Sequence, residues 1–213
     1  MRVASLAAIL AAFVVAVPTQ VSANALKNAG FEDPTVDTGS ALGNWFRFGS
    51  GAQGFASQNT TMPRSGLQAM ELITVAANQF AGVFQDLEDP SSPGTKLPVA
   101  PGQTVVFSGY NKAVGPFLGT RELKIEWIGA PASIDFNTSI GADYEPFSFS
   151  AVAPAGTTGA RITYAVATFG PGQGDADVFL DDFRVEVRPI PEPGALGLAS
   201  LGLAAFLRRR NRR

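Results

Sequence analysis

Apolar residues recur at every second position in the segments 123–127 and 162–167 of this chain, and within 179–188 one strand parity is shared by Phe179, Phe183, Val185 and Val187. Successive side chains of a β-strand point to opposite faces, so this period predicts strands with at least one buried face. No segment between residues 24 and 190 shows the period of an amphipathic helix. Further short strands are predicted at 44–48, 67–74, 79–85, 103–110 and 146–151.

Glycine and proline separate these segments. The chain holds 23 glycines and 15 prolines in 213 residues, about 18% against a usual ~12%. Turn signals occur at Gly49–Gly51, Pro90–Gly94, Pro101–Gly102 and Pro171–Gly174. About nine short strands joined in this way, without an internal repeat, predict an all-β domain: a two-sheet antiparallel β-sandwich of the jelly-roll type.

The N-terminal end has a different pattern. Residues 6–17 form an unbroken apolar run shortly after Arg2, and small residues follow at 21–23. This arrangement predicts a signal helix over 1–23 that signal peptidase removes. The alternative is a buried N-terminal helix, but the run is not amphipathic and Pro18 ends it.

The C-terminal end is also apolar. Residues 194–207 contain Ser200 as their only polar side chain, and five arginines follow within 208–213. A helix of that length measures about 21 Å against a hydrocarbon core of ~30 Å, so it predicts a short transmembrane helix. The arginines favour the cytoplasmic side, which places the body of the protein outside the cytoplasm.

A proline-glutamate-proline tripeptide precedes this apolar segment. Together with the apolar run and the arginines, it resembles the PEP-CTERM sorting signal of exported bacterial proteins. That resemblance implies an exosortase that cuts near the tripeptide and releases the body to the cell surface or exopolysaccharide matrix. The alternative is a plain membrane anchor, in which the tripeptide would have no function. The residues that carry the resemblance are Pro191, Glu192, Pro193, Arg208, Arg209 and Arg210.

We therefore expect three parts, 1–23, 24–190 and 191–213. The terminal parts hold six of the 16 basic and one of the 18 acidic side chains, which leaves the body with about seven net negative charges. An acidic body disfavours nucleic acid as a partner and suits a divalent cation. We expect membrane contact only through the tail, before processing.

The chain has no histidine and no cysteine. Imidazole and thiol catalysis, zinc clusters and disulfides are therefore excluded. Asp181–Asp182 resembles a glycosidase carboxylate pair, but adjacent strand residues point to opposite faces and cannot flank one bond. We expect a protein that is not an enzyme.

Four segments of the body resemble, in this order, the galactose-binding-like β-jelly-roll group, and within it carbohydrate-binding modules of the family 4, 9 and 22 type. This resemblance implies a non-catalytic domain that binds carbohydrate. The four segments are Asn28–Glu32, Arg64–Leu72, Val83–Leu87 with Val99–Ser108, and Val178–Val185.

Asp181 has the same strand parity as Phe179 and Phe183, so its carboxylate is expected to point toward the core. An unpaired charge there is costly, and a cation held by oxygens would neutralise it. The family resemblance implies a structural calcium between Glu32 and Asp181, and we include Asp182 in this predicted metal site. A bulge that turns Asp181 to solvent, or a pair with arginine or lysine, remains the alternative.

Sugar binding requires an exposed aromatic ring with polar groups around it. Trp45 and Trp127 are predicted to lie in the core. The remaining candidates for a carbohydrate site are Tyr110 and Tyr144, with Asn111, Glu122 and Glu126 as polar neighbours.

Two functions fit these patterns. The first is a surface protein that associates with exopolysaccharide through its jelly-roll domain. The second is a structural protein of the cell surface or biofilm matrix with the same fold and no sugar site. An exposed aromatic ring on a sheet face would favour the first, and a face of small residues such as Ala165 and Ala167 the second.

Overall fold

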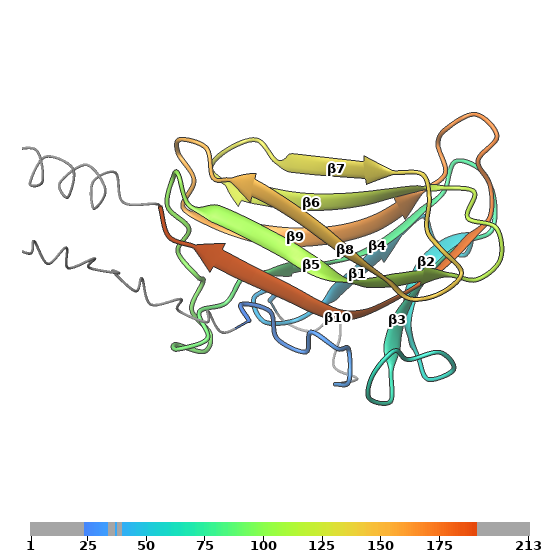
Figure 1. Ribbon diagram of the computed structural model, residues 1–213, viewed down its shortest axis with the longest axis horizontal. Helices are drawn as coiled ribbons and strands as arrows, with labels where there is room; N and C mark the ends of the chain where they lie inside the picture. The colour runs from blue at the N-terminus through green and yellow to red at the C-terminus, as the bar shows by residue number, and fades with distance from the viewer. Residues whose placement is uncertain (1–23, 34–36, 38–39, 191–213) are drawn as a thin grey trace, which may run out of the picture.

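The computed structural model describes residues 24–33, 37 and 40–190, and these residues form a β-sandwich (Figure 1). All regular elements within these ranges are strands, which confirms the predicted fold class. The ten strands are β1 (Phe46–Gly49), β2 (Gly54–Asn59), β3 (Ala69–Thr74), β4 (Phe80–Asp86), β5 (Thr104–Ala113), β6 (Thr120–Ile128), β7 (Ser133–Asn137), β8 (Glu145–Val152), β9 (Gly159–Ala167) and β10 (Ala176–Arg188).

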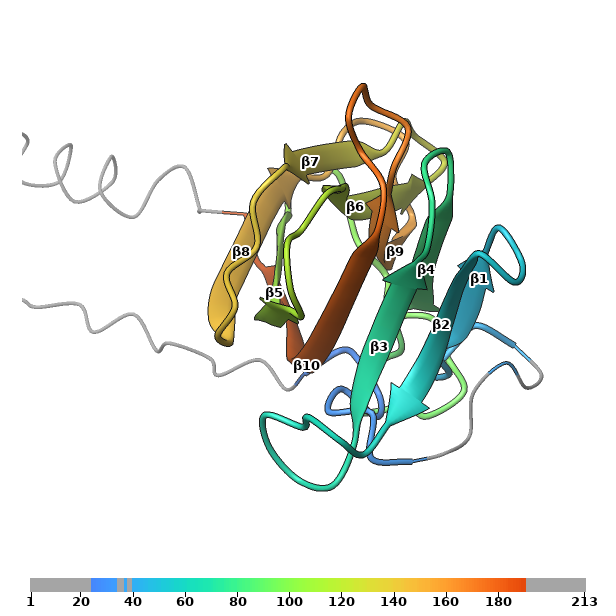
Figure 2. The same cartoon turned by 90° about the vertical axis from the view of Figure 1, so that its right-hand side faces the viewer.

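The strands form two five-stranded antiparallel sheets. The first sheet has the order β1-β4-β9-β6-β7, and the second has the order β2-β3-β10-β5-β8. Figure 2 shows the two sheets as separate layers. Each sheet has one face toward the core between the layers and one outer face. Both outer faces carry candidate functional residues.

The predicted strands are present within a few residues of their expected ends. The sequence pattern missed β2 and β7, which carry little apolar alternation. The predicted signal helix in 1–23 and membrane helix in 191–213 lie outside the described residues. Within the described part of the chain, no helix is long and apolar enough to cross a membrane.

Aromatic side chains fill the centre of the core. Phe183 contacts the rings of Phe31, Trp45 and Phe107 at centroid distances of 5.1–5.5 Å. Trp45 is fully buried and Trp127 is 5% exposed, so both tryptophans lie in the core as predicted. Such tilted and edge-on ring contacts stabilise a core beyond the effect of area burial alone.

The closing strand β10 contains a β-bulge that changes the predicted arrangement. Asp181 pairs with Tyr110 and Arg184 with Ser108, so three steps along β10 oppose two along β5. The extra residue, Asp182, has a left-handed φ of 50°. A bulge reverses the alternation of side chains. Phe179 and Asp181 therefore lie on the outer face of the second sheet, whereas Phe183 points into the core, and the prediction of one shared face was wrong.

Candidate functional site

The structure does not bring the five predicted carbohydrate-site residues together. Tyr110 and Tyr144 lie on the outer side of the second sheet, where the β2–β3 loop (residues 60–68) covers them. The guanidinium carbon of Arg64 lies 3.4 Å from the centroid of the Tyr110 ring. The Tyr144 hydroxyl donates a hydrogen bond to the Met62 carbonyl oxygen at 2.7 Å. Both tyrosines are therefore engaged by the protein itself.

Asn111 lies between the sheets and is fully buried. Its side-chain oxygen accepts hydrogen bonds from the Tyr164 hydroxyl at 3.1 Å and from Arg121 at 3.4 Å. Its position next to Tyr110 in sequence placed it on the opposite face of β5, because neighbouring strand residues alternate. The Asn111 amide therefore makes its hydrogen bonds inside the protein, where a sugar cannot reach it.

Glu122 and Glu126 lie on β6, on the outer face of the first sheet. They are thus on the opposite side of the sandwich from the tyrosines. The five predicted residues therefore lie in three different environments. The prediction did not consider strand parity or which sheet each strand joins, and both separate residues that are close in sequence.

The outer face of the first sheet holds an aromatic row that the sequence analysis did not single out. Neighbouring rings along this row have centroids 5.6–6.2 Å apart. We call the five residues the phenylalanine row: Phe46, Phe84, Phe48, Phe80 and Phe169, in spatial order.

Strand pairing builds this row. Phe46 lies directly opposite Phe84, and Phe48 lies opposite Gly82. Because Gly82 has no side chain, the Phe48 ring lies over it: a Cβ there would stand 2.3 Å from the ring tip. The Arg161 guanidinium lies 4.3 Å from the Phe84 centroid and covers that ring. Phe169, at the far end of the row, is 61% exposed.

Across the rest of the same face, the side chains are small on β9, polar on β6 and apolar on β7. Thr163, Ala165 and Ala167 on β9 lie beside the row. Glu122 and Lys124 on β6 form an ion pair at 2.6 Å, and Thr163 donates to Glu126 at 2.5 Å. At the edge strand β7, Phe136 is 59% exposed and lies opposite Glu122.

This face combines the groups that a sugar chain needs. Aromatic rings can pack against the apolar side of a pyranose, and carboxylates, hydroxyls and ammonium groups can exchange hydrogen bonds with its hydroxyls. Of the predicted polar residues, Glu122 and Glu126 lie on the same face as these rings, and Glu122 lies opposite Phe136. The alternation of Phe46 with Phe48 and of Phe80 with Phe84 was visible in the sequence, but the pairing of β1 with β4 was not.

The three predicted metal ligands do converge. Gly30 lies between them: a Cβ on it would have Asp181 Oδ1, Asp182 Oδ1 and Glu32 Cγ within 3.7–3.8 Å. Asp181 is fully buried although it lies on the outer face, because the β2–β3 loop covers it. Burial raises the pKa of Asp181, and hydrogen bonds from the amides of Ser65, Asp182 and Arg64 oppose that rise.

The groups that face these carboxylates do not fit a calcium ion. Calcium requires several oxygen ligands. Here the carboxylate oxygens accept hydrogen bonds from backbone N–H groups, a hydroxyl and a guanidinium. Within the described ranges, no cluster of three or more acidic side chains has a geometry that could hold a metal ion. Calcium at this position stays a prediction from family resemblance.

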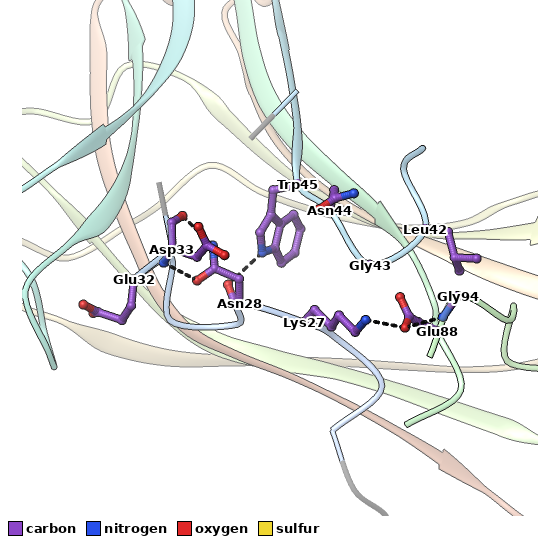
Figure 3. Close-up of a pocket in the computed structure, with 10 residues that line it drawn as sticks. All are labelled: Lys27, Asn28, Glu32, Asp33, Leu42, Gly43, Asn44, Trp45, Glu88 and Gly94. Carbon is purple, nitrogen blue, oxygen red and sulfur yellow. Dashed lines mark hydrogen bonds and ion pairs between the residues drawn. The ribbon is translucent and has the colours of Figure 1, made fainter. Parts of the chain in front are cut away.

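A polar pocket of about 540 Å³ lies beside this cluster, at the opening segment of the body (Figure 3). Lys27 and Glu88 form an ion pair at 2.5 Å on one side of it. The indole N–H of Trp45 donates to the Asn28 carbonyl oxygen at 2.9 Å. These groups already satisfy one another, so the pocket offers less to a ligand than the phenylalanine row does.

Two further carboxyl groups, those of Glu71 and Asp177, lie together on the outer face of the second sheet. Burial raises the pKa of Asp177 to about 6, and the charge and hydrogen bond of Glu71 add to the effect. Glu71 accepts a hydrogen bond from Asn59 at 2.7 Å. Sequence reasoning missed this pair because β3 and β10 are far apart along the chain.

Comparison with known proteins adds two findings. Residues 189–213 match the PEP-CTERM protein-sorting motif. A search of curated proteins finds no relative.

Several solved structures share the fold of the body. TmCBM61, solved in complex with beta-1,4-galactotriose, is 16% identical, with a TM-score of 0.54 over 78% of this chain and all of that one. An apo cyclase from Fischerella sp. is 16% identical, with a TM-score of 0.56 over 79% of this chain and 97% of that one. The enzymatically active domain of tailspike protein 4 from bacteriophage CBA120 is 13% identical, with a TM-score of 0.56; the match covers 77% of this chain and 21% of that one.

These likenesses define the fold of the body. Its body is a β-sandwich of the kind found in carbohydrate-binding modules, as the resemblance implied. At such low identity the neighbours show the fold alone, since the same fold carries out different functions. The chain also carries a C-terminal PEP-CTERM sorting motif, which indicates export.

Proposed function

We propose that this chain is an exported protein that an exosortase processes and releases to the cell surface or exopolysaccharide matrix. The observation that carries this proposal is the position of the sorting motif. The motif begins at residue 189, and the last strand of the sandwich ends at Arg188. A cut near Pro191–Pro193 would therefore release the whole sandwich and remove the apolar tail.

The body, in this proposal, binds polysaccharide without catalysis, on the outer face of the first sheet. The phenylalanine row and the polar side chains beside it support this assignment. Phe169 and Phe136 are the most exposed rings on this face, so they are the side chains that a sugar chain would meet first. Exposed apolar patches on a protein surface often mark binding sites.

The lack of catalysis is also part of the proposal. The structural neighbours include a cyclase and an enzymatically active tailspike domain, so the fold does not decide the question. The chain has no histidine or cysteine to act as base or nucleophile. Glu71 and Asp177, a carboxyl pair on the outer face of the second sheet, interact directly, which leaves no space for a substrate bond between the two groups.

Affinity electrophoresis through the host's own exopolysaccharide tests the binding. We expect retardation of the wild-type protein and its loss in the double variant Phe169→Ala/Phe136→Ala. Phe55→Ala is the matched control, because Phe55 is an exposed phenylalanine on β2 in the other sheet. Weak, reversible binding is expected, since sugar hydroxyls exchange water hydrogen bonds for protein ones at small net gain.

Two other results would contradict this assignment of the binding site. Loss of retardation in Tyr110→Ala or Tyr144→Ala, but not in the phenylalanine variant, would move the site to the second sheet. Absence of retardation of the wild-type protein at millimolar sensitivity would favour the structural matrix role.

A further inference from the structure

The β2–β3 loop (residues 60–68) packs against three carboxylates from two distant parts of the chain. Asp181 and Asp182 come from the bulge in β10, and Glu32 comes from the opening segment. Figure 2 shows this loop extending beyond the ends of β2 and β3, on the side of β10. The loop residues that meet the carboxylates are Arg64, Ser65, Leu67 and Gln68.

Asp181 receives donors on both oxygens. Its Oδ2 accepts the backbone N–H groups of Arg64 at 2.9 Å and Ser65 at 3.0 Å. Its Oδ1 accepts the N–H of Asp182 at 2.7 Å. A carboxylate that accepts two or three backbone N–H bonds is stabilised in its charged form even when it is buried.

Asp182 receives the only full positive charge that the described contacts bring to this cluster. The Arg64 guanidinium forms an ion pair with it, and the Ser65 hydroxyl donates to it at 2.7 Å. The same guanidinium stacks on the Tyr110 ring, which lies directly opposite Asp181 across the strands. Arginine is suited to this double contact because its planar group pairs with a carboxylate and packs on a ring at the same time.

Glu32 completes the cluster. It accepts the N–H groups of Leu67 at 2.9 Å and Gln68 at 3.4 Å. Gly66, between Ser65 and Leu67, has a left-handed φ of 61°, and a Cβ there would lie 2.1 Å from Glu32 Oε1. The glycine therefore lets the loop backbone approach the carboxylate closely enough to donate.

We infer that the β2–β3 loop closes this carboxylate cluster without a metal ion, with Arg64 as a built-in cation. A calcium site would present carbonyl, hydroxyl or carboxylate oxygens toward the same point. The loop backbone here presents N–H groups instead, and their partly positive hydrogens stabilise the charged carboxylates as a cation otherwise would. The resemblance to carbohydrate-binding modules thus extends to the carboxylates of this site but not to its ion.

Thermal unfolding of the full chain, purified in a mild detergent, tests the inference. We expect the same Tm in millimolar calcium chloride and in millimolar EDTA, and no heat of calcium binding by titration calorimetry. Arg64→Ala should lower the Tm by about 2–4 °C, the shift that corresponds to loss of one charge-assisted pair in a protein of this size. Arg184→Ala is the control, because it removes an arginine that pairs with Glu186 on the same strand, outside the cluster.

The response to calcium then distinguishes a cluster closed by the loop from a cluster that holds a calcium ion. In Arg64→Ala, added calcium should not restore the lost Tm, because the backbone N–H groups of the loop still donate to Asp181 and Glu32. A wild-type Tm that falls in EDTA, or calorimetric binding of calcium to the wild-type chain, would overturn the inference. So would an Arg64→Ala variant with an unchanged Tm.

Discussion

The tip of the Phe48 ring lies over Gly82 on the neighbouring strand, so close that a Cβ on Gly82 would stand 2.3 Å from Phe48 Cζ and 2.7 Å from the Tyr164 carbonyl oxygen. Neither contact is compatible with a methyl group, and the carbonyl belongs to the backbone of β9. Glycine at this position is thus what allows the phenylalanine row to lie flat on the sheet.

This contact gives the first prediction. Gly82→Ala should destabilise the protein by about 1–3 kcal/mol, the usual cost of overpacking a well-packed site. Chemical denaturation measures the change. Gly174→Ala is the control, because a Cβ at Gly174 would meet nothing within 4 Å. Equal stability of the two variants would show that the Phe48 ring does not lie over Gly82.

The second prediction concerns the Glu71–Asp177 pair. The folded-state pKa of Asp177, raised to about 6, lies above its usual value of 3.8. Folding therefore binds a proton between these values, so the contribution to stability is complete below about pH 4 and is lost as the pH rises through about 6. Asp177→Asn should stabilise the protein relative to wild type at pH 7.5 more than at pH 4.5.

Because Asp177 is only partly buried, solvent screening reduces the effect, and we expect a difference of about 1 kcal/mol between the two pH values. Denaturant unfolding at both pH values measures it. Asp175→Asn, which changes an exposed neighbouring carboxylate, should show no such difference. A pH-independent effect of Asp177→Asn would contradict the raised pKa of Asp177.

The third prediction compares the two bulge aspartates. Asp181→Ala should cost more stability than Asp182→Ala, because it leaves three backbone N–H groups without their acceptor in a fully buried position. Each unsatisfied donor costs about 1–3 kcal/mol where water does not reach it. Asp182 is partly exposed, so water can replace it. The reverse order in urea denaturation would contradict the described contacts.

Strand periodicity predicted most of the fold. The segments around Leu123 and Ile162 are strands with their apolar side chains in the core, because their pattern is local and regular. The bulge at Asp182 was not predictable in this way. One extra residue moves every later side chain of the strand to the other face, and the amino-acid pattern does not mark where that residue lies. The Asp181 carboxylate was expected to point toward the core, but it is buried on the outer face instead, under the β2–β3 loop.

The candidate site was harder to predict than the fold. Glu122 and Glu126 were identified from sequence, yet the aromatic rings on the same face were not. The phenylalanine row requires β1 to pair with β4 and β4 with β9, and both pairings join distant segments. The tyrosines were chosen because both tryptophans were predicted to lie in the core. Arg64, from a loop more than 40 residues before Tyr110, covers the Tyr110 ring.

Intact mass of the protein recovered from the surface of a host that has the sorting enzyme tests the central claim most directly. The account predicts a chain that begins near Asn24 and ends close to Pro191–Pro193, because signal peptidase and exosortase remove the two terminal parts. A surface form that still carries Arg213 would contradict exosortase processing and leave a plain membrane anchor as the function of the tail.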